Sequence, residues 1–292
     1  MHAIIGNKRA ATIAGVTIRV LLGVVFIISA AAKLWSIDQF ELYVYSFGFL
    51  SLDLSFILAR LCIGVELTLG ALLVTGWHRR ATLTSTALIL LFFSIFLGYA
   101  ALSGRTDSCQ CFGQLADMPP AVSLLKNAIL LALTLLATKL AMKEQSRRWR
   151  LWACIGAAAV GMTLPFVISV PDNWMFGAST ERYDEATFNQ LIDGKLASRN
   201  PREDGKLVAF VTPECPYCRM ARQKIDYITQ RNNLSPNDII YVEPTDIGIE
   251  TFLKTTHGAR PLILLLKDGE VVATFHYRNI SERKIVGTLA TD

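Results

Sequence analysis

Five apolar stretches, each about 20 residues long, constrain most strongly how this chain can fold, because a helix of that length crosses the hydrocarbon core of a bilayer. Of the 292 residues, 52% are hydrophobic and 18% are charged. A soluble domain has about 25% charged residues. This composition excludes a fully soluble enzyme, a disordered chain and a small disulfide-rich protein. The stretches predict membrane-spanning helices at residues 11–34, 54–75, 81–102, 121–140 and 151–170.

Basic residues fall on one side of these stretches. The net charge is +7 over residues 1–171 and −2 over residues 172–292, which gives the +5 of the whole chain. Cytoplasmic loops carry an excess of lysine and arginine, so topology explains the basic character better than a nucleic-acid partner does. We therefore expect a five-pass bacterial inner-membrane protein with a cytoplasmic N-terminus and a periplasmic C-terminal domain. The basic residues that set this orientation are Lys8, Arg9, Arg79, Arg80, Lys143, Arg147, Arg148 and Arg150.

The first stretch has a second interpretation, a cleaved signal peptide, because three small residues, Ala30-Ala31-Ala32, resemble a cleavage site. The stretch is long for such a peptide and contains Arg19, which favours a membrane span. Either interpretation leaves the later segments on the same sides of the membrane.

The segment after the fifth stretch alternates helical and strand patterns. An apolar strand at residues 207–211 leads to Cys215-Pro216-Tyr217-Cys218, and a helix is expected at residues 219–230. A Cys-x-x-Cys pair in this context indicates thiol–disulfide chemistry. Cys215 would lie at a helix N-terminus, where the helix dipole favours a thiolate, and Cys218 could resolve a mixed disulfide. The alternative, half of a zinc site, lacks further ligands in this domain, so no metal is expected.

Residues 184–290 resemble the thioredoxin superfamily. The likeness depends on the sequence from Phe210 to Cys218 and on Arg260-Pro261 at the start of an expected strand. The resemblance implies that Pro261 is a cis-proline facing the active site; a trans-proline that merely begins an edge strand is the alternative. The Cys-Pro-Tyr-Cys tetrapeptide is glutaredoxin-like, which leaves the redox potential and the use of glutathione open.

A second cysteine pair, Cys109 and Cys111, lies in the loop between the third and fourth stretches, on the same side as Cys215. A Cys-x-Cys disulfide closes a small, strained ring, and strain makes such a bond labile. We therefore expect a redox role. Two independent structural thiols or a metal-binding loop are the alternatives.

With this loop, residues 15–140 resemble the MauE/DoxX family of four-helix membrane proteins. The resemblance implies a redox role, because MauE proteins are linked to disulfide formation in methylamine dehydrogenase and DoxX-type proteins to quinone-coupled sulfur chemistry. The additional C-terminal domain departs from that family and suggests a more general thiol–disulfide system. The matching residues are Ser29, Lys33, Asp38, Phe40, Glu66, Cys109-Gln110-Cys111-Phe112-Gly113, Lys126 and Asn127.

The predicted fold is a membrane all-α helical bundle of four spans plus a fifth linking span, followed by an α/β thioredoxin-like domain. The expected boundaries are 1–144 for the four-helix domain, 145–179 for the fifth helix and connector, and 180–292 for the thioredoxin-like domain. This layout resembles fused vitamin K epoxide reductase proteins, although their membrane Cys-x-x-Cys is missing here.

Several ionisable residues lie inside the predicted spans, where charges are costly and face the bundle interior. Arg19 and Glu66 have similar depths, which predicts an ion pair. Lys33, Arg60 and Lys126 lie toward the outer side, where they could stabilise a thiolate of the loop pair or bind a quinone oxygen. The alternative for these three is snorkelling to the interface.

Two further cysteines, Cys62 and Cys154, lie in the second and fifth stretches. Their depths differ by about 10 Å or more, too far for a disulfide. Each is expected to be a small buried apolar residue.

These features predict a membrane-bound thiol–disulfide oxidoreductase. Electrons would pass between client thiols, Cys215/Cys218, Cys109/Cys111 and a quinone, in support of periplasmic disulfide formation. The expected partners are periplasmic protein thiols or disulfides and the lipid bilayer, without metal, nucleotide or nucleic acid. One alternative is a periplasmic disulfide reductase or isomerase. Another is a non-enzymatic assembly factor that tethers a thioredoxin-like module and needs neither the loop pair nor a quinone.

Overall fold

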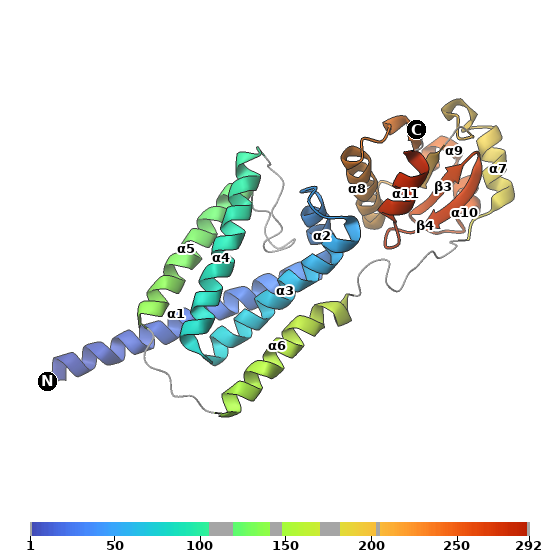
Figure 1. Cartoon of the computed structure of the whole chain (residues 1–292). Coiled ribbons are helices and arrows are strands. Elements are labelled where there is room, and N and C mark those ends of the chain that lie inside the picture. The colour runs from blue at the N-terminus through green and yellow to red at the C-terminus, as the bar shows by residue number, and fades with distance from the viewer. Residues whose placement is uncertain (1, 105–118, 141–147, 170–181, 203–204, 291–292) are drawn as a thin grey trace. The chain divides into compact units, whose positions relative to one another are not determined.

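The computed structural model in Figure 1 describes residues 2–104, 119–140, 148–169, 182–202 and 205–290. It divides into two compact units. The first comprises Met1–Val44 and Ile57–Val170, and the second comprises Tyr45–Phe56 and Pro171–Asp292. Each unit is described by itself.

Helices make up the first unit, with the end of α2 and the first turn of α3 belonging to the second. Four helical segments among the described residues are long and apolar enough to cross a membrane: Ala11–Trp35, Leu52–Thr75, Arg79–Leu102 and Pro120–Leu140. They correspond to the first four predicted spans. The full helices are α1 (His2–Trp35), α2 (Ile37–Tyr45), α3 (Leu52–Thr75), α4 (Arg79–Leu102), α5 (Pro120–Leu140) and α6 (Arg148–Ile168).

The fifth predicted span coincides with α6. Its described apolar part, Cys154–Ile168, is shorter than the other four, so the five-pass topology stays a prediction. Small residues let α6 approach α3 closely. A Cβ at Gly161 would lie 2.5 Å from Thr68 Oγ1, and one at Gly64 would lie 3.1 Å from the Gly161 carbonyl oxygen. Close approach at small residues is typical of helix pairs in membranes.

The contact between α1 and α3 has the same character and fixes their register. A Cβ on Gly23 would lie 2.8 Å from the Gly70 carbonyl oxygen, and one on Gly70 would lie 2.6 Å from Ile27 Cγ1. Larger residues at either position would force the two helices apart. A cluster of buried apolar side chains extends from this contact and includes Leu22, Phe26, Leu69, Leu73, Leu83, Leu90 and Ala137.

The second unit contains a mixed four-stranded sheet in the order β2-β1-β3-β4. Strand β1 pairs in parallel with β2 and antiparallel with β3, and β3 pairs antiparallel with β4. The Asp268-Gly269 turn between β3 and β4 has positive φ at both residues, as a two-residue type I′ hairpin turn requires. The strands are β1 (Lys206–Phe210), β2 (Ile239–Val242), β3 (Leu262–Lys267) and β4 (Glu270–Phe275).

Helices cover both faces of this sheet. Alternate residues of a strand point to opposite faces, and all five residues of β1 are buried. Leu207 and Ala209 pack with residues of α8 and α11, whereas Val208 and Phe210 pack with residues of α7 and α10. The helices are α7 (Glu185–Asp193), α8 (Pro216–Arg231), α9 (Pro244–Ile247), α10 (Ile249–Thr256) and α11 (Glu282–Leu289).

The segment Tyr45–Phe56, which links α2 to α3, contributes to the core of the second unit. Tyr45, Leu52 and Phe56 are each 1% exposed and belong to the cluster on the α8 face of the sheet. The Glu282 carboxylate accepts hydrogen bonds from the Tyr45 hydroxyl and the Leu52 amide, both at 2.9 Å. Arg231 donates to the Leu50 carbonyl, and its guanidinium carbon lies 5.2 Å from the Tyr45 ring centroid. The core of this unit is therefore not contiguous in sequence.

Replacing Glu282 with alanine is expected to loosen this segment, because two hydrogen bonds worth about 1 kcal/mol each are lost. Hydrogen exchange followed by mass spectrometry should show roughly tenfold or greater acceleration of amide exchange in the Tyr45–Phe56 segment. Glu250→Ala, a change at an exposed carboxylate on α10, is the control. Equal exchange in both variants would contradict this role of Glu282.

Candidate functional site

The turn from β1 into α8 positions the Cys-x-x-Cys motif. Strand β1 ends at Phe210, and Cys215 is the N-cap of α8, with extended backbone angles of φ −82° and ψ 117°. Pro216 occupies the first helical position, where its fixed φ suits a helix and its missing N–H costs nothing. The Cys218 amide donates to the Cys215 carbonyl at 3.1 Å, and the Arg219 amide donates to the same oxygen at 3.2 Å. Helix α8 therefore begins within the motif, at Pro216.

The two sulfur atoms differ in exposure. Cys215 is half-buried, whereas Cys218 is 1% exposed and packs with Ala221 and Ile225 in the core of the second unit. Burial raises the pKa of the Cys218 thiol to about 11, although a contact with Thr212 opposes this shift. Thr212 Oγ1 lies 3.9 Å from Cys218 Sγ. Cys218 is therefore a neutral thiol near pH 7, and Cys215 is the accessible sulfur of the pair.

The Arg260–Pro261 peptide lies beside the motif. The Cys215 thiol is 4.0 Å from the Arg260 carbonyl oxygen. The peptide bond between Arg260 and Pro261 is cis, which confirms what the thioredoxin resemblance implies for Pro261. The chain therefore brings the start of β3 next to the exposed cysteine, although 42 residues of sequence lie between Cys218 and Pro261.

An aromatic stack adjoins the motif and could not be foreseen from the sequence. The rings of Tyr217 and Tyr277 lie 4.6 Å apart at an angle of 23°. Tyr277 follows β4 and is 60 residues from Tyr217 in sequence, so no local pattern predicts the contact. The sequence gives one indirect signal for it. Tyr217 and Lys224, which both contact Tyr277, are seven residues apart and share a face of α8.

Buried ion pairs occupy the first unit, in a different arrangement from the predicted one. Lys33 Nζ lies 2.7 Å from both Glu66 oxygens and 2.9 Å from Ser29 Oγ. Arg19 instead donates to the carbonyl oxygens of Leu73 and Val74. The predicted Arg19–Glu66 pair is therefore wrong. The Gly23–Gly70 register sets Arg19 against the last turn of α3, where helix carbonyls lack intrahelical donors.

A second buried pair joins Arg60 of α3 to Glu41 of α2, and both side chains are 0% exposed. Arg60 Nε also donates to the Ser169 carbonyl oxygen at 2.6 Å. Glu41 was not a candidate from the sequence, because α2 lies outside the predicted spans. Lys33 and Arg60 each have a carboxylate partner, and their predicted role of binding a quinone oxygen or a thiolate stays a prediction. Lys126 is half-buried on α5, and its predicted role is untested.

The loop cysteines Cys109 and Cys111 lie outside the described residues. Their predicted pairing and their reach to Cys215 therefore stay predictions. Among the described residues, no group of three or more histidine, cysteine, aspartate or glutamate side chains could hold a metal ion.

Comparison with known proteins shows what two parts of the chain are similar to. Residues 11–140 match the family model described as methylamine utilisation protein MauE. The chain is also 26% identical to Protein TlpB of Flavobacterium psychrophilum over 298 residues, covering 84% of this chain and 81% of that protein. No solved structure matches the chain significantly.

Residues 11–140 form a MauE-type region, and a thioredoxin-like part follows it. The resemblance of residues 15–140 to MauE is thus confirmed, and the apolar helices and these relatives indicate a bacterial membrane protein. The motif cysteines lie in the thioredoxin-like part and the buried ion pairs in the MauE part.

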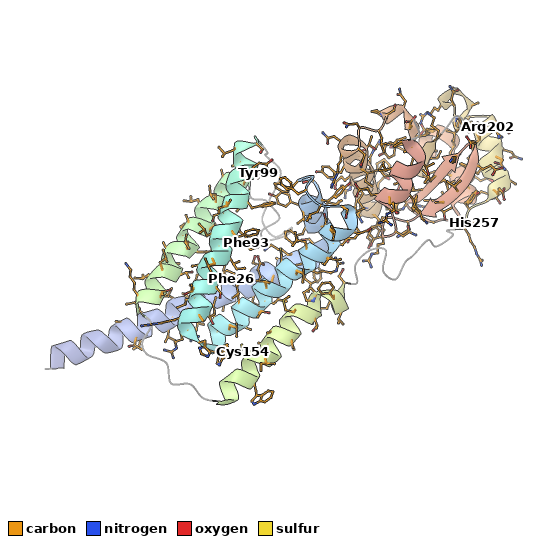
Figure 2. The ribbon with its side chains drawn as sticks, in the orientation of Figure 1. Phe26, Phe93, Tyr99, Cys154, Arg202 and His257 are labelled. Atoms are coloured by element: carbon orange, nitrogen blue, oxygen red, sulfur yellow. The ribbon has the colours of Figure 1, made fainter. Side chains whose placement is uncertain are left out.

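The MauE domain and its linking helix hold two further thiols. Cys62 on α3 is half-buried and packs against a cluster that includes Ala30 and Phe40. Cys154 lies on α6 (Figure 2) and is also half-buried. Both are free thiols, in agreement with the expectation that they do not pair.

Alkylation should distinguish the two motif cysteines of the thioredoxin-like domain. With a pKa of about 11, only about one Cys218 in a thousand is a thiolate at pH 8, and this fraction rises about tenfold per pH unit. Brief iodoacetamide treatment of the reduced protein is expected to label Cys215 at least tenfold faster than Cys218. Fragmentation of the tryptic peptide 207–219, which contains both cysteines, measures the ratio. Equal labelling at pH 8 would contradict the raised pKa.

The Lys33–Glu66 pair predicts a double-mutant effect in the MauE domain. Lys33→Met or Glu66→Leu alone leaves a buried charge without its partner, at a cost of about 3–5 kcal/mol. The double variant removes both charges and should recover most of that loss. Thermal unfolding in detergent, followed by tryptophan fluorescence, measures the three variants, with Lys139→Met at an exposed position of α5 as control. Additive losses would show that the two charges do not interact.

Proposed function

We propose that this protein is a membrane-bound thiol–disulfide oxidoreductase that supports disulfide formation in periplasmic proteins, with a quinone as electron acceptor. The observation that carries the proposal is the unequal exposure of Cys215 and Cys218 at the start of α8, beside Arg260–Pro261. A client thiolate can attack an accessible sulfur. A buried sulfur can act as the leaving group and is protected from thiols in solution.

In the first half-reaction, a client thiolate attacks Cys215 Sγ of the oxidised pair. A sulfur–sulfur bond forms between client and Cys215, the Cys215–Cys218 bond breaks, and Cys218 takes up a proton. The second client thiolate then attacks the client sulfur of the mixed disulfide and releases Cys215. The client leaves as a disulfide, and the pair holds two electrons and two protons.

The raised pKa of Cys218 affects the lifetime of the mixed disulfide. At neutral pH almost all Cys218 is protonated, and a thiol is a poor nucleophile compared with a thiolate. Cys218 therefore returns slowly to the mixed disulfide, which gives the second client thiol time to react. A fast Cys218 would eject the client unoxidised.

In the second half-reaction, the Cys215/Cys218 dithiol reduces a Cys109–Cys111 disulfide by exchange. The loop dithiol then passes two electrons and two protons to a quinone, which becomes a hydroquinone. The sequence supports this step through the labile Cys-x-Cys ring expected on the same side of the membrane as Cys215. The apolar outer surfaces of the spanning helices suit a bilayer, in which quinones dissolve.

The proposal includes the topology of the chain. We infer a cytoplasmic N-terminus and α6 as a fifth pass, so that the thioredoxin-like domain is periplasmic. The distribution of basic residues supports this orientation. The close contact of α6 with α3 at Gly64 and Gly161 supports a place for α6 in the bundle.

A coupled assay tests the function. The purified chain in detergent receives a reduced dithiol protein and a soluble quinone, and quinone absorbance is followed. We expect reduction by the intact protein and a loss of at least a hundredfold in both Cys215→Ser and Cys109→Ser. Cys62→Ser, a change at a thiol outside the relay, is the matched control and should retain the rate.

Two results would contradict the proposal. If the intact protein does not reduce quinone but reduces a protein disulfide when given a donor, it is a reductase or isomerase. If Cys109→Ser retains full quinone reduction, the relay through the loop pair is wrong.

A further inference from the structure

Tyr217, two residues after Cys215, presents an aromatic surface that a second aromatic ring supports. Tyr217 lies between the two cysteines in sequence and is 48% exposed. One face of its ring stacks on Tyr277 at 4.6 Å. Tyr277 itself is 5% exposed, so it supports Tyr217 and offers little surface of its own.

Lys224 and Arg278 hold Tyr277 in place. The Lys224 ammonium, on a side chain that is 1% exposed, donates to the Tyr277 carbonyl at 3.0 Å and lies 5.7 Å from the Tyr277 ring centroid. Arg278 Nε donates to the Tyr277 hydroxyl at 2.6 Å. Since Lys224 and Tyr217 share a face of α8, Tyr277 spans two turns of that helix. A ring anchored at both ends limits the rotamers available to Tyr217.

Basic residues lie next to the motif cysteines and next to Tyr277. Arg219 follows Cys218 directly and is exposed, and Arg260, also exposed, has its carbonyl 4.0 Å from Cys215 Sγ. Arg278 adjoins Tyr277. One exposed carboxylate, Glu214, directly precedes Cys215. The three arginines and this glutamate carry a net charge of +2, whereas residues 172–292 as a whole carry −2.

From this arrangement we propose that Tyr217, positioned by Tyr277, is the client-binding surface of the motif and that it selects peptide segments of a particular kind. Such a segment has an apolar residue next to its reactive cysteine, which packs on the Tyr217 ring, and acidic residues nearby, which face the arginines. Burying an apolar side chain on an aromatic ring and pairing exposed charges both favour this class of client. The inference rests on the proposed thiol–disulfide function and adds its substrate class.

The test uses the full chain with Cys218→Ser, which traps a mixed disulfide at Cys215. Four peptides carry their cysteine as a disulfide with 2-nitro-5-thiobenzoate. They combine Leu or Ser before the cysteine with Asp or Lys flanks. Attack of Cys215 forms a bond to the peptide sulfur and releases the coloured thiolate, which is the better leaving group. The rate for each peptide is divided by the rate for Ellman's reagent, and the background of a Cys215→Ser/Cys218→Ser chain is subtracted.

We expect the Leu/Asp peptide to react about tenfold or more faster than the Ser/Lys peptide, a difference well within the value of one buried apolar side chain. Tyr217→Ala and Tyr277→Ala should bring the Leu-to-Ser ratio close to one, and Tyr277→Phe, which keeps the ring, should retain it. The control is Tyr183→Ala, which removes an aromatic side chain that contacts Phe188 in the cluster on the other face of the sheet. Added salt or Arg219→Gln/Arg278→Gln should lower the Asp-to-Lys ratio.

The outcomes separate this inference from the function beneath it. Equal rates for the four peptides, with a normal reaction toward Ellman's reagent, would overturn the client class alone. An unchanged Leu-to-Ser ratio in Tyr217→Ala, an exposed site where folding is not at risk, would overturn the role of that ring. Failure of Cys215 to react with Ellman's reagent would contradict the thiol–disulfide function itself.

Discussion

The burial of one sulfur and the accessibility of the other, three residues apart at the start of α8, is the constraint on which the chemistry of this protein depends. Cys218 can be buried only because β1 is a central strand whose side chains fill the core beneath the helix. Cys215 remains accessible because it is the N-cap, where the chain has not yet entered the helix. Pro216 fixes the transition between the two. The fold therefore determines which thiol is accessible and which one is buried and protonated.

The MauE-type region contains charged side chains inside an apolar helical bundle. Glu66 pairs with Lys33 and Glu41 pairs with Arg60, and all four side chains are almost fully buried. Arg19 reaches the carbonyl oxygens at the end of α3. Such charges are tolerated in a membrane when they pair or meet backbone acceptors. In this chain they tie α1, α2 and α3 together.

Local signals account for what could be predicted from the sequence. Continuous stretches of sequence indicate several features. They are the span lengths, the strand before Cys215, the Asp268-Gly269 hairpin and the position of Pro261. The missed features depend on register and on contacts between distant segments. The depths of Arg19 and Glu66 were counted from the ends of apolar stretches, but the Gly23–Gly70 contact decides which residues face each other. No periodicity indicates that Tyr277 lies against Tyr217.

The same reason explains why the expected domain boundary differs from the compact units of the structure. Composition separates an apolar, basic first part from an acidic second part, and a boundary placed on composition is necessarily continuous. Tyr45, Leu52 and Phe56 lie in the first part by sequence, yet their side chains complete the core beside α8 and α11. The hydrogen bonds from Tyr45 and Leu52 to Glu282 join residues more than two hundred positions apart, which no local pattern can indicate.

The most direct test of the redox role of Cys215 and Cys218 is a redox titration. The purified chain is equilibrated with thiol redox buffers of graded potential and quenched with acid, and the mass of the peptide 207–219 is measured. We expect one two-electron transition in which this peptide loses two hydrogens as Cys215 and Cys218 form a bond, and regains them on reduction. A peptide that never forms this bond at any potential, while other thiols of the chain oxidise, would contradict a redox role for the motif.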